Sequence, residues 1–203
     1  MSSWMKLLEE GEPREHVVQL YGRDEELLAC HVGRYLAEGL RRDEGLLMIA
    51  TPGHTQKILR RLEVGDGDPD AATREGRLVL LDAEATLARF MDADGPSWEL
   101  FQEVVGGAIG ELQSRIGHGR IRAFGEMVGL LWTAGQRAAA LRLEAHWNCL
   151  LETHAISLFC AYPIDLFHGD CDDPSVSALM AAHGHSFAAP RTLFSAPARN
   201  GAG

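Results

Sequence analysis

Five short apolar runs rich in β-branched and aromatic residues punctuate the chain. They lie at residues 16–21, 46–50, 77–82, 120–124 and 156–162. Within each run the apolar residues are nearly continuous rather than alternating, which is typical of strands covered by helices on both faces. The runs therefore predict buried strands of a parallel sheet.

Segments with helical periodicity separate these runs. Residues 24–40 carry Leu28, Tyr35 and Leu36 at helical spacing. Further helices are predicted after the turn at 51–53 and over 97–116, 136–154 and 174–183. Strand and helix alternate five times, so we predict one α/β domain: a mostly parallel sheet of five or more strands, flanked by helices and joined by right-handed crossovers.

The breaks in this pattern predict the domain limits. We expect an N-terminal arm at 1–15, one domain at 16–190 and a flexible tail at 191–203. Residues 63–76 form a polar excursion, and Gly106, Gly107 and Gly110 weaken the helix at 97–116.

Composition narrows the function classes. The chain has 203 residues, 46% of them hydrophobic, and a net charge of -10, which gives no reason to expect binding to nucleic acid or to anionic membranes. No run reaches the ~18–20 apolar residues of a membrane span. The acidic start lacks the features of a signal peptide, so a cytoplasmic protein is expected.

The strand ends predict a binding site, because ligands of open α/β sheets bind beyond the carboxyl ends of the strands. Polar side chains at or after those ends are Tyr21, Arg23, Thr51, His54, Asp82, Glu126 and Tyr162. Met127, Trp132 and Phe159 supply a predicted apolar wall. Together they predict a pocket for a small, mostly apolar molecule with one or two polar atoms.

Glu126 directly follows a predicted strand and precedes apolar residues. Two roles stay open from the sequence: a carboxyl group with a raised pKa that acts as acid or base, or an acceptor for the N–H groups of the following turn. Contact with a ligand is compatible with either role.

The first strand-to-helix turn argues against nucleotide binding. A phosphate loop needs several glycines and a lysine, whereas this turn is "YGRDEE". Asp24, Glu25 and Glu26 suit the positive end of a helix and would repel a triphosphate.

Cysteine and histidine spacing predicts neither a metal nor another cofactor. Cys30, Cys149, Cys160 and Cys171 form no CxxC pair, and buried free thiols are expected. His146 with Cys149, and His154 with Cys160, lack the compact partner motif of a zinc site. His183 and His185 are expected at a solvated helix end.

Nucleophilic catalysis also lacks a motif. There is no GxSxG elbow, and Ser157 would lie inside a strand. Cys160, near a strand end, is either a reactive thiol or, as we favour, a buried apolar residue.

Several motifs nevertheless resemble one family. In order they are "HVVQLYGRDEELLACHVGRYLAEGL", "GLLMIATPGH", "FGEMVGLLW", "ALRLEAHWNCL", "LFCAYP" and "HSFAAP", spanning His16 to Pro190. They resemble the MEDS family, the DcmR-type sensory domains of prokaryotic regulators, proposed to sense simple hydrocarbon derivatives. The resemblance implies a RecA/KaiC-related core that has lost its ATP machinery. Glu126 one place beyond Gly125, and Thr51 and Pro52 after the second strand, depart from the metal-holding and catalytic acids of such ATPases.

The resemblance also implies functional positions. The motif residues are His16, Tyr21, Gly125, Glu126, Trp132, Leu143, Glu144, Trp147, Asn148, Cys160, Tyr162 and His185. Glu144 and Asn148 are one helical turn apart and share a face, while the role of His16, at the opposite end of its strand, stays open. We predict ligand contacts from Tyr21, His54, Glu126, Trp132, Glu144, Asn148, Cys160 and Tyr162.

These inferences predict a cytoplasmic, non-enzymatic sensory domain. A small organic ligand would touch Glu126, Tyr21 and Tyr162 and change the surface shown to a signalling partner of the kinase, anti-sigma or transcription-regulator type, or to a second copy of the chain. Two alternatives remain open at this point. One is a residual nucleotide hydrolase or small hydrolase that uses Glu126 or Cys160, and the other is an interaction module with an empty crevice.

Overall fold

A computed structural model describes residues 10, 12–64, 67–117, 119–165, 174–183 and 185–188. Six strands of this part of the chain form a sheet in which every neighbouring pair is parallel. The strand order is β3-β2-β6-β7-β1-β8. The strands are β1 (His16–Leu20), β2 (Gly45–Ala50), β3 (Leu78–Asp82), β6 (Ile121–Gly125), β7 (Ile156–Tyr162) and β8 (His185–Ala188). The predicted α/β fold and its five strands are confirmed, and β8 is an additional edge strand.

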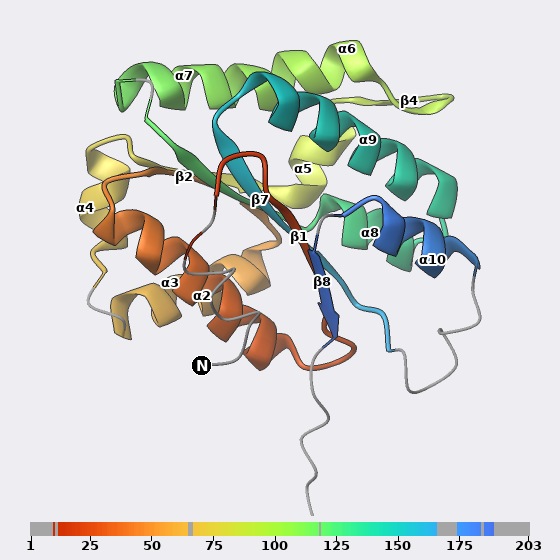
Figure 1. Cartoon of the computed structure of the whole chain (residues 1–203), viewed down its shortest axis with the longest axis horizontal. Coiled ribbons are helices and arrows are strands. Elements are labelled where there is room, and N and C mark those ends of the chain that lie inside the picture. Colours follow the sequence, from red (N-terminus) through yellow and green to blue (C-terminus); the bar gives the residue numbers. More distant parts are fainter. Residues whose placement is uncertain are drawn as a thin grey trace, which may run out of the picture.

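Helices cover both faces of the sheet (Figure 1). One face carries α2 (Glu25–Arg41), α3 (Pro52–Val64) and α4 (Pro69–Arg74). The other carries α5 (Ala83–Ala88), α6 (Trp98–Phe101), α7 (Gly107–Arg115), α8 (Met127–Thr133), α9 (Arg137–Thr153) and α10 (Pro174–Ala181). A two-residue pair of strands, β4 (Met91–Asp92) and β5 (Gly95–Pro96), lies apart from the main sheet.

The two faces enclose separate hydrophobic cores. Under α2 and α3, Phe159 packs edge-on against Phe124, with ring centroids 5.8 Å apart. Under α8 and α9 the core contains Met127 and Trp132. The prediction that Met127, Trp132 and Phe159 line one common wall is therefore wrong, because the sheet lies between them.

Local sequence signals explain two departures from the predicted elements. The polar excursion at 63–76 contains α4, because Asp68 caps the helix by accepting from the backbone N–H of Ala71 at 2.7 Å and Pro69 occupies the first turn. The predicted helix at 97–116 contains a π-helical turn, η1 (Gln102–Gly106), which ends at one of its glycines.

A buried ion pair lies in β6, beneath α2. The Arg122 side chain is fully buried, and its Nε donates to Oε2 of Glu44 at 2.5 Å. The remaining guanidinium nitrogens donate to the backbone oxygens of Tyr35 and Glu10, each at 3.2 Å. The guanidinium also lies 5.0 Å from the centroid of the Tyr35 ring. We refer to Arg122, Glu44 and Tyr35 as the arginine cluster.

No helix of the described residues is long and apolar enough to cross a membrane. Only residues 10 and 12–15 of the predicted arm at 1–15 are described. The predicted tail at 191–203, Cys171 and the side chain of His185 lie outside the described part of the chain.

Candidate functional site

Helix α9 turns two polar side chains toward the sheet. Glu144 is fully buried, and Asn148 lies one turn later on the same face. Both reach the imidazole of His16 at the start of β1: Oδ1 of Asn148 lies 2.7 Å from Nδ1, and Oε2 of Glu144 lies 3.3 Å from Nε2. The shared face predicted for Glu144 and Asn148 thus brings both to one ring, and it gives His16 a place in the site.

Strand β7 adds a thiol and a phenol, because alternate residues of a strand point to the same face. Tyr162 donates its hydroxyl hydrogen to Oε1 of Glu144 at 2.5 Å. Sγ of Cys160 lies 3.3 Å from Nε2 of His16 and 3.7 Å from Oε2 of Glu144. Both side chains are completely buried.

His183, two residues beyond the C-terminal end of α10, completes the group. Nδ1 of His183 lies 2.7 Å from the backbone oxygen of Leu179, and Nε2 lies 3.3 Å from Oε1 of Glu144. The rings of His183 and His16 are 4.1 Å apart. The predicted solvated helix end is wrong for His183, because Val176 and Leu179 anchor α10 in the core and bury the ring. We call His16, Glu144, Cys160 and His183 the α9 cluster.

In the α9 cluster, charge and burial act in opposite directions on the pKa values of Glu144 and His183. Burial by itself raises the pKa of Glu144, but the adjacent imidazoles of His16 and His183 outweigh burial, and the pKa is lowered. Burial lowers the pKa of His183, yet the neighbouring Glu144 raises it overall. Burial and the Glu144 charge both raise the pKa values of the Cys160 thiol and the Tyr162 phenol. Glu144 is therefore an ionised carboxylate in the protein interior, where charges require partners.

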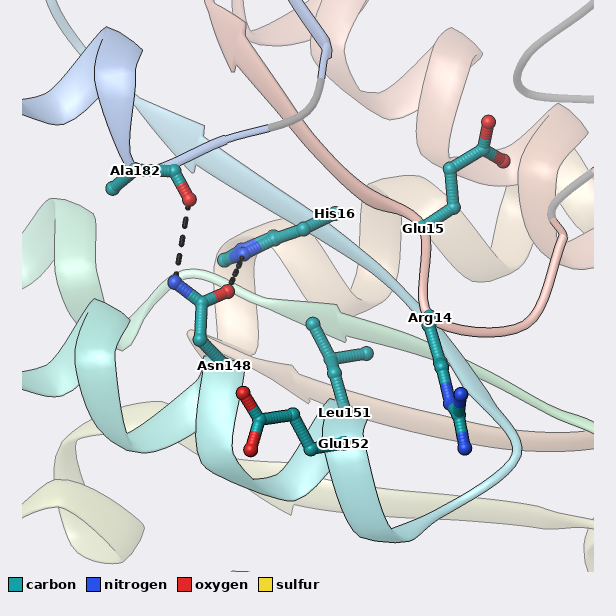
Figure 2. Close-up of a pocket in the computed structure, with 7 residues that line it drawn as sticks. All are labelled: Arg14, Glu15, His16, Asn148, Leu151, Glu152 and Ala182. Atoms are coloured by element: carbon teal, nitrogen blue, oxygen red, sulfur yellow. Dashed lines mark hydrogen bonds between the residues drawn. The ribbon is translucent and has the colours of Figure 1, made fainter.

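A surface pocket of about 500 Å³ reaches the edge of this cluster. Its lining residues are Arg14, Glu15, His16, Asn148, Leu151, Glu152 and Ala182. Figure 2 shows Asn148 between His16 and Ala182, with one hydrogen bond to each. The Asn148 amide therefore links the pocket, the buried imidazole and the end of α10.

Three other predicted site residues meet at the carboxyl edge of the sheet. Nδ1 of His54 lies 2.9 Å from Oε2 of the buried Glu126, and the ring of Tyr21 lies 6.2 Å from that of His54. The hydrogen bond with Glu126 raises the pKa of His54, against the effect of burial. Burial, then the Glu126 charge, raises the pKa of Tyr21. Glu126 makes no side-chain cap for α8, so one of the two roles left open from the sequence, acceptor for the N–H groups of the following turn, is wrong.

The eight predicted ligand contacts thus form two groups. Tyr21, His54 and Glu126 lie at the carboxyl edge, whereas Glu144, Asn148, Cys160 and Tyr162 lie under α9. Trp132 belongs with the second group, since its ring packs edge-on against Tyr162 at 5.4 Å. Tyr162 donates its hydroxyl hydrogen to Glu144, whereas the sequence placed it in one site with Tyr21 and Glu126.

Four acidic residues singled out in the sequence have structural partners. Asp24 caps α2 through the N–H of Leu27, and Asp82 caps α5 through that of Ala85. Glu25 and Glu26 at the start of α2 pair with Lys57 and Arg61 of α3. Of the cysteines described, Cys160 is buried as predicted, whereas Cys149 is exposed and Cys30 is partly exposed, which corrects the prediction for both.

A family model described as MEDS, the methanogen/methylotroph DcmR sensory domain, matches residues 15–183. The chain belongs to the MEDS family. No curated protein matches it. The family's description gives this MEDS domain a sensory role. The matched segment begins one residue before His16 and ends at His183, so it includes the whole α9 cluster.

Proposed function

We propose that this MEDS domain binds a small organic molecule in the pocket beside α9 and reports it to a partner protein through α10. The bridging position of Asn148 carries the proposal. Its Oδ1 faces His16 at 2.7 Å, and its Nδ2 donates to the backbone oxygen of Ala182 at 3.3 Å. A molecule that competes for this amide acts on the end of α10 directly.

The pocket suits a ligand with a short apolar part and one polar group. Leu151 and Ala182 provide apolar surface. Polar groups at the wall come from Arg14, Glu15, His16, Asn148 and Glu152. Small-molecule sites combine apolar surface with polar groups that fix the orientation of the ligand. A simple hydrocarbon derivative that carries oxygen or a halogen meets this description.

The signal follows from a difference in affinity between two forms. A ligand shifts a conformation only as far as it binds one form better than the other. Here the ligand favours the form in which Asn148 releases Ala182, which loosens α10 and the following edge strand β8 beside β1. An edge strand offers backbone groups to another chain. The partner is a kinase, anti-sigma or transcription-regulator module, or a second copy of the domain.

The proposal includes a non-catalytic carboxyl edge derived from a RecA/KaiC-like nucleotide hydrolase. The turn after β1 supports this part, because Asp24 caps α2 where a phosphate loop would hold phosphate. With ATP and magnesium, purified protein is expected to show neither turnover nor a rise in melting temperature. Turnover that Glu126→Gln abolishes would overturn this part.

The test is a thermal-shift screen with short-chain alcohols, ketones, carboxylates and haloalkanes, together with native mass spectrometry of protein purified from its host. We expect at least one compound to stabilise the wild type and the Gln102→Ala control, whose amide is exposed. Asn148→Ala should lose this response, whereas Glu126→Gln should keep it. The opposite pattern would move the ligand to the carboxyl edge, and no response to any compound would contradict the proposal.

A further inference from the structure

We propose that His16, Glu144, Cys160 and His183 bind one divalent transition-metal ion of the zinc type. This inference goes beyond the sensory proposal, because it depends on the geometry of the α9 cluster and not on any organic ligand. Each residue offers one ligand atom, and the four atoms lie within 4.8 Å of one another. All four residues are buried.

The spacing of three of these atoms matches a tetrahedral shell, and the fourth lies within 4.8 Å of them. Metal–nitrogen, –oxygen and –sulfur bonds of about 2.0–2.3 Å place neighbouring ligand atoms about 3.3–3.8 Å apart. Nε2 of His16 lies 3.3 Å from both Sγ of Cys160 and Oε2 of Glu144, and these two are 3.7 Å apart. Nε2 of His183 lies 3.3 Å from Oε1 of the same carboxylate. Three ligand atoms therefore already have the separations of a metal shell, and the shell closes when His183 Nε2 approaches them.

The outer hydrogen bonds fix the imidazoles in the form that binds a metal. Nδ2 of Asn148 donates to Ala182, so Oδ1 faces His16 and its Nδ1 must donate. Nδ1 of His183 faces the carbonyl of Leu179 and must also donate. With Nδ1 protonated, neutral imidazoles present the lone pair of Nε2 to the cluster. A second-shell oxygen that accepts from the other ring nitrogen accompanies nearly every metal-ligating histidine.

In this form the two Nε2 atoms carry no hydrogen, and the hydrogens that reach the Glu144 carboxylate come from Cys160 and Tyr162. The side chain of His183 is completely buried, yet its Nε2 has no hydrogen-bond partner within the described parts of the chain. The hydroxyl of Tyr162 supplies one hydrogen to Glu144. An unpartnered buried nitrogen is costly, and a cation between the lone pairs removes that cost.

The donor set selects the class of ion. Two imidazoles, a sulfur and one carboxylate suit zinc and neighbouring transition metals, whereas magnesium and calcium prefer oxygen. A thiolate and a carboxylate together neutralise a divalent ion in the interior. Binding releases the Cys160 proton to solvent. The four ligands come from β1, α9, β7 and the end of α10, which explains why no compact motif marks the site.

The ion would join the C-terminal segment to the core. His183 is contributed from the end of α10, just before β8 pairs with β1. Metal occupancy therefore fixes α10 on α9, and metal loss releases the segment.

Cobalt(II) titration of the metal-depleted full chain tests the inference, since cobalt reports geometry and thiolate ligation by its absorption. We expect one equivalent to produce intense visible bands of tetrahedral cobalt and a thiolate charge-transfer band in the near ultraviolet, and zinc to displace both. Weak octahedral bands only, or no stoichiometric binding of either ion, would overturn the proposal.

Variants locate the ion. Cys160→Ser should abolish the charge-transfer band, whereas Cys149→Ser, which changes an exposed cysteine, should keep it. Asn148→Ala keeps all four ligands and should weaken affinity roughly 10- to 100-fold, the usual cost of losing a second-shell partner. Retention of the band in folded Cys160→Ser would contradict the site. If Cys160→Ser does not fold, unchanged affinity in Asn148→Ala would contradict it. Because the readout is absorption, loss of the organic response with an intact cobalt spectrum overturns only the proposed function.

Discussion

Two groups of buried charged residues, the arginine cluster and the α9 cluster, lie on opposite faces of the same sheet. They differ in whether each hydrogen-bond acceptor faces a donor. In the arginine cluster, donors meet acceptors: Arg122 donates to Glu44 and to two backbone oxygens. In the α9 cluster, the Nε2 atoms of His16 and His183 both face the Glu144 carboxylate, and with Nδ1 protonated they are acceptors that face an acceptor. The first group is closed by partners within the described residues, whereas the second is the site that we propose for a cation.

The difference separates a structural role from a binding role. A closed ion pair is maintained because removing either partner leaves an unpaired buried charge. A group of lone pairs held in place by second-shell hydrogen bonds has the arrangement of a ligand shell before its ion arrives. Changes to the first group should therefore affect stability alone, and changes to the second should affect binding as well.

The largest expected effect comes from the arginine cluster. Arg122→Ala removes the closer and fully buried partner of Glu44, leaves only Arg120 at 3.6 Å, and should lower the free energy of unfolding by about 3–5 kcal/mol, measured by urea denaturation. Arg41→Ala, which breaks an exposed pair with Glu38, should cost at most about 1 kcal/mol. Equal losses in the two variants would remove the distinction between the buried pair and a surface pair.

Zinc should stabilise the folded protein by binding to the α9 cluster only. Free zinc at about 100 times its dissociation constant should raise the free energy of unfolding by about 2.7 kcal/mol, and a chelator should reverse the gain. Glu44→Gln, in the arginine cluster, should keep this increment, while Cys160→Ser should lose it. Calorimetric melting with and without zinc measures both, and an increment that survives Cys160→Ser would contradict the comparison.

A side chain added at Gly39, next to the arginine cluster, should lower stability and leave the affinity for metal unchanged. A Cβ atom on Gly39 would lie 2.6 Å from Cδ2 of Leu46 and 2.9 Å from Cδ of Arg122. Gly39→Ala should therefore lower the free energy of unfolding by about 1–3 kcal/mol. Gly53→Ala, with no atom within 4 Å of the added carbon, is the control and should be neutral or stabilising. A cobalt affinity reduced by Gly39→Ala would show that the two clusters are coupled.

The smallest effect concerns the carboxyl edge, outside both clusters. Glu126 raises the pKa of His54, so their bond stabilises the fold fully below the pKa of an unfolded histidine, and this stability is lost as pH rises through the raised folded value. Glu126→Gln should move the pKa of His54 back toward its ordinary value, as followed by NMR titration. The control is His31, whose pKa burial lowers to about 4. An unchanged pKa of His54 in Glu126→Gln would contradict the observed pairing of His54 with Glu126.

The sequence predicted the fold better than the site because strand and helix periodicity is local. Each of the five predicted strands matches an observed one within one residue at either end. The missed strand β8 is only four residues long and adds to the sheet edge through its pairing with β1. Helix α8 was not predicted, because Met127 and Trp132 were interpreted as the apolar wall of a pocket.

The site required distances that sequence periodicity does not contain. The helical repeat correctly placed Glu144 and Asn148 on one face, but it could not show that His16, 132 positions before Asn148, lies opposite them. His183 follows a short helix and has no local signal of burial; the packing of α10 decides it. Strand alternation could have paired Cys160 with Tyr162, which both point toward α9.

The most direct test of the central claim is a crystal of the zinc-loaded protein with data collected on both sides of the zinc absorption edge. The account predicts one anomalous peak per chain, bonded to Nε2 of His16, Nε2 of His183, Sγ of Cys160 and a carboxylate oxygen of Glu144. A peak elsewhere, or a cluster closed by its own hydrogen bonds in zinc-saturated crystals, would contradict it.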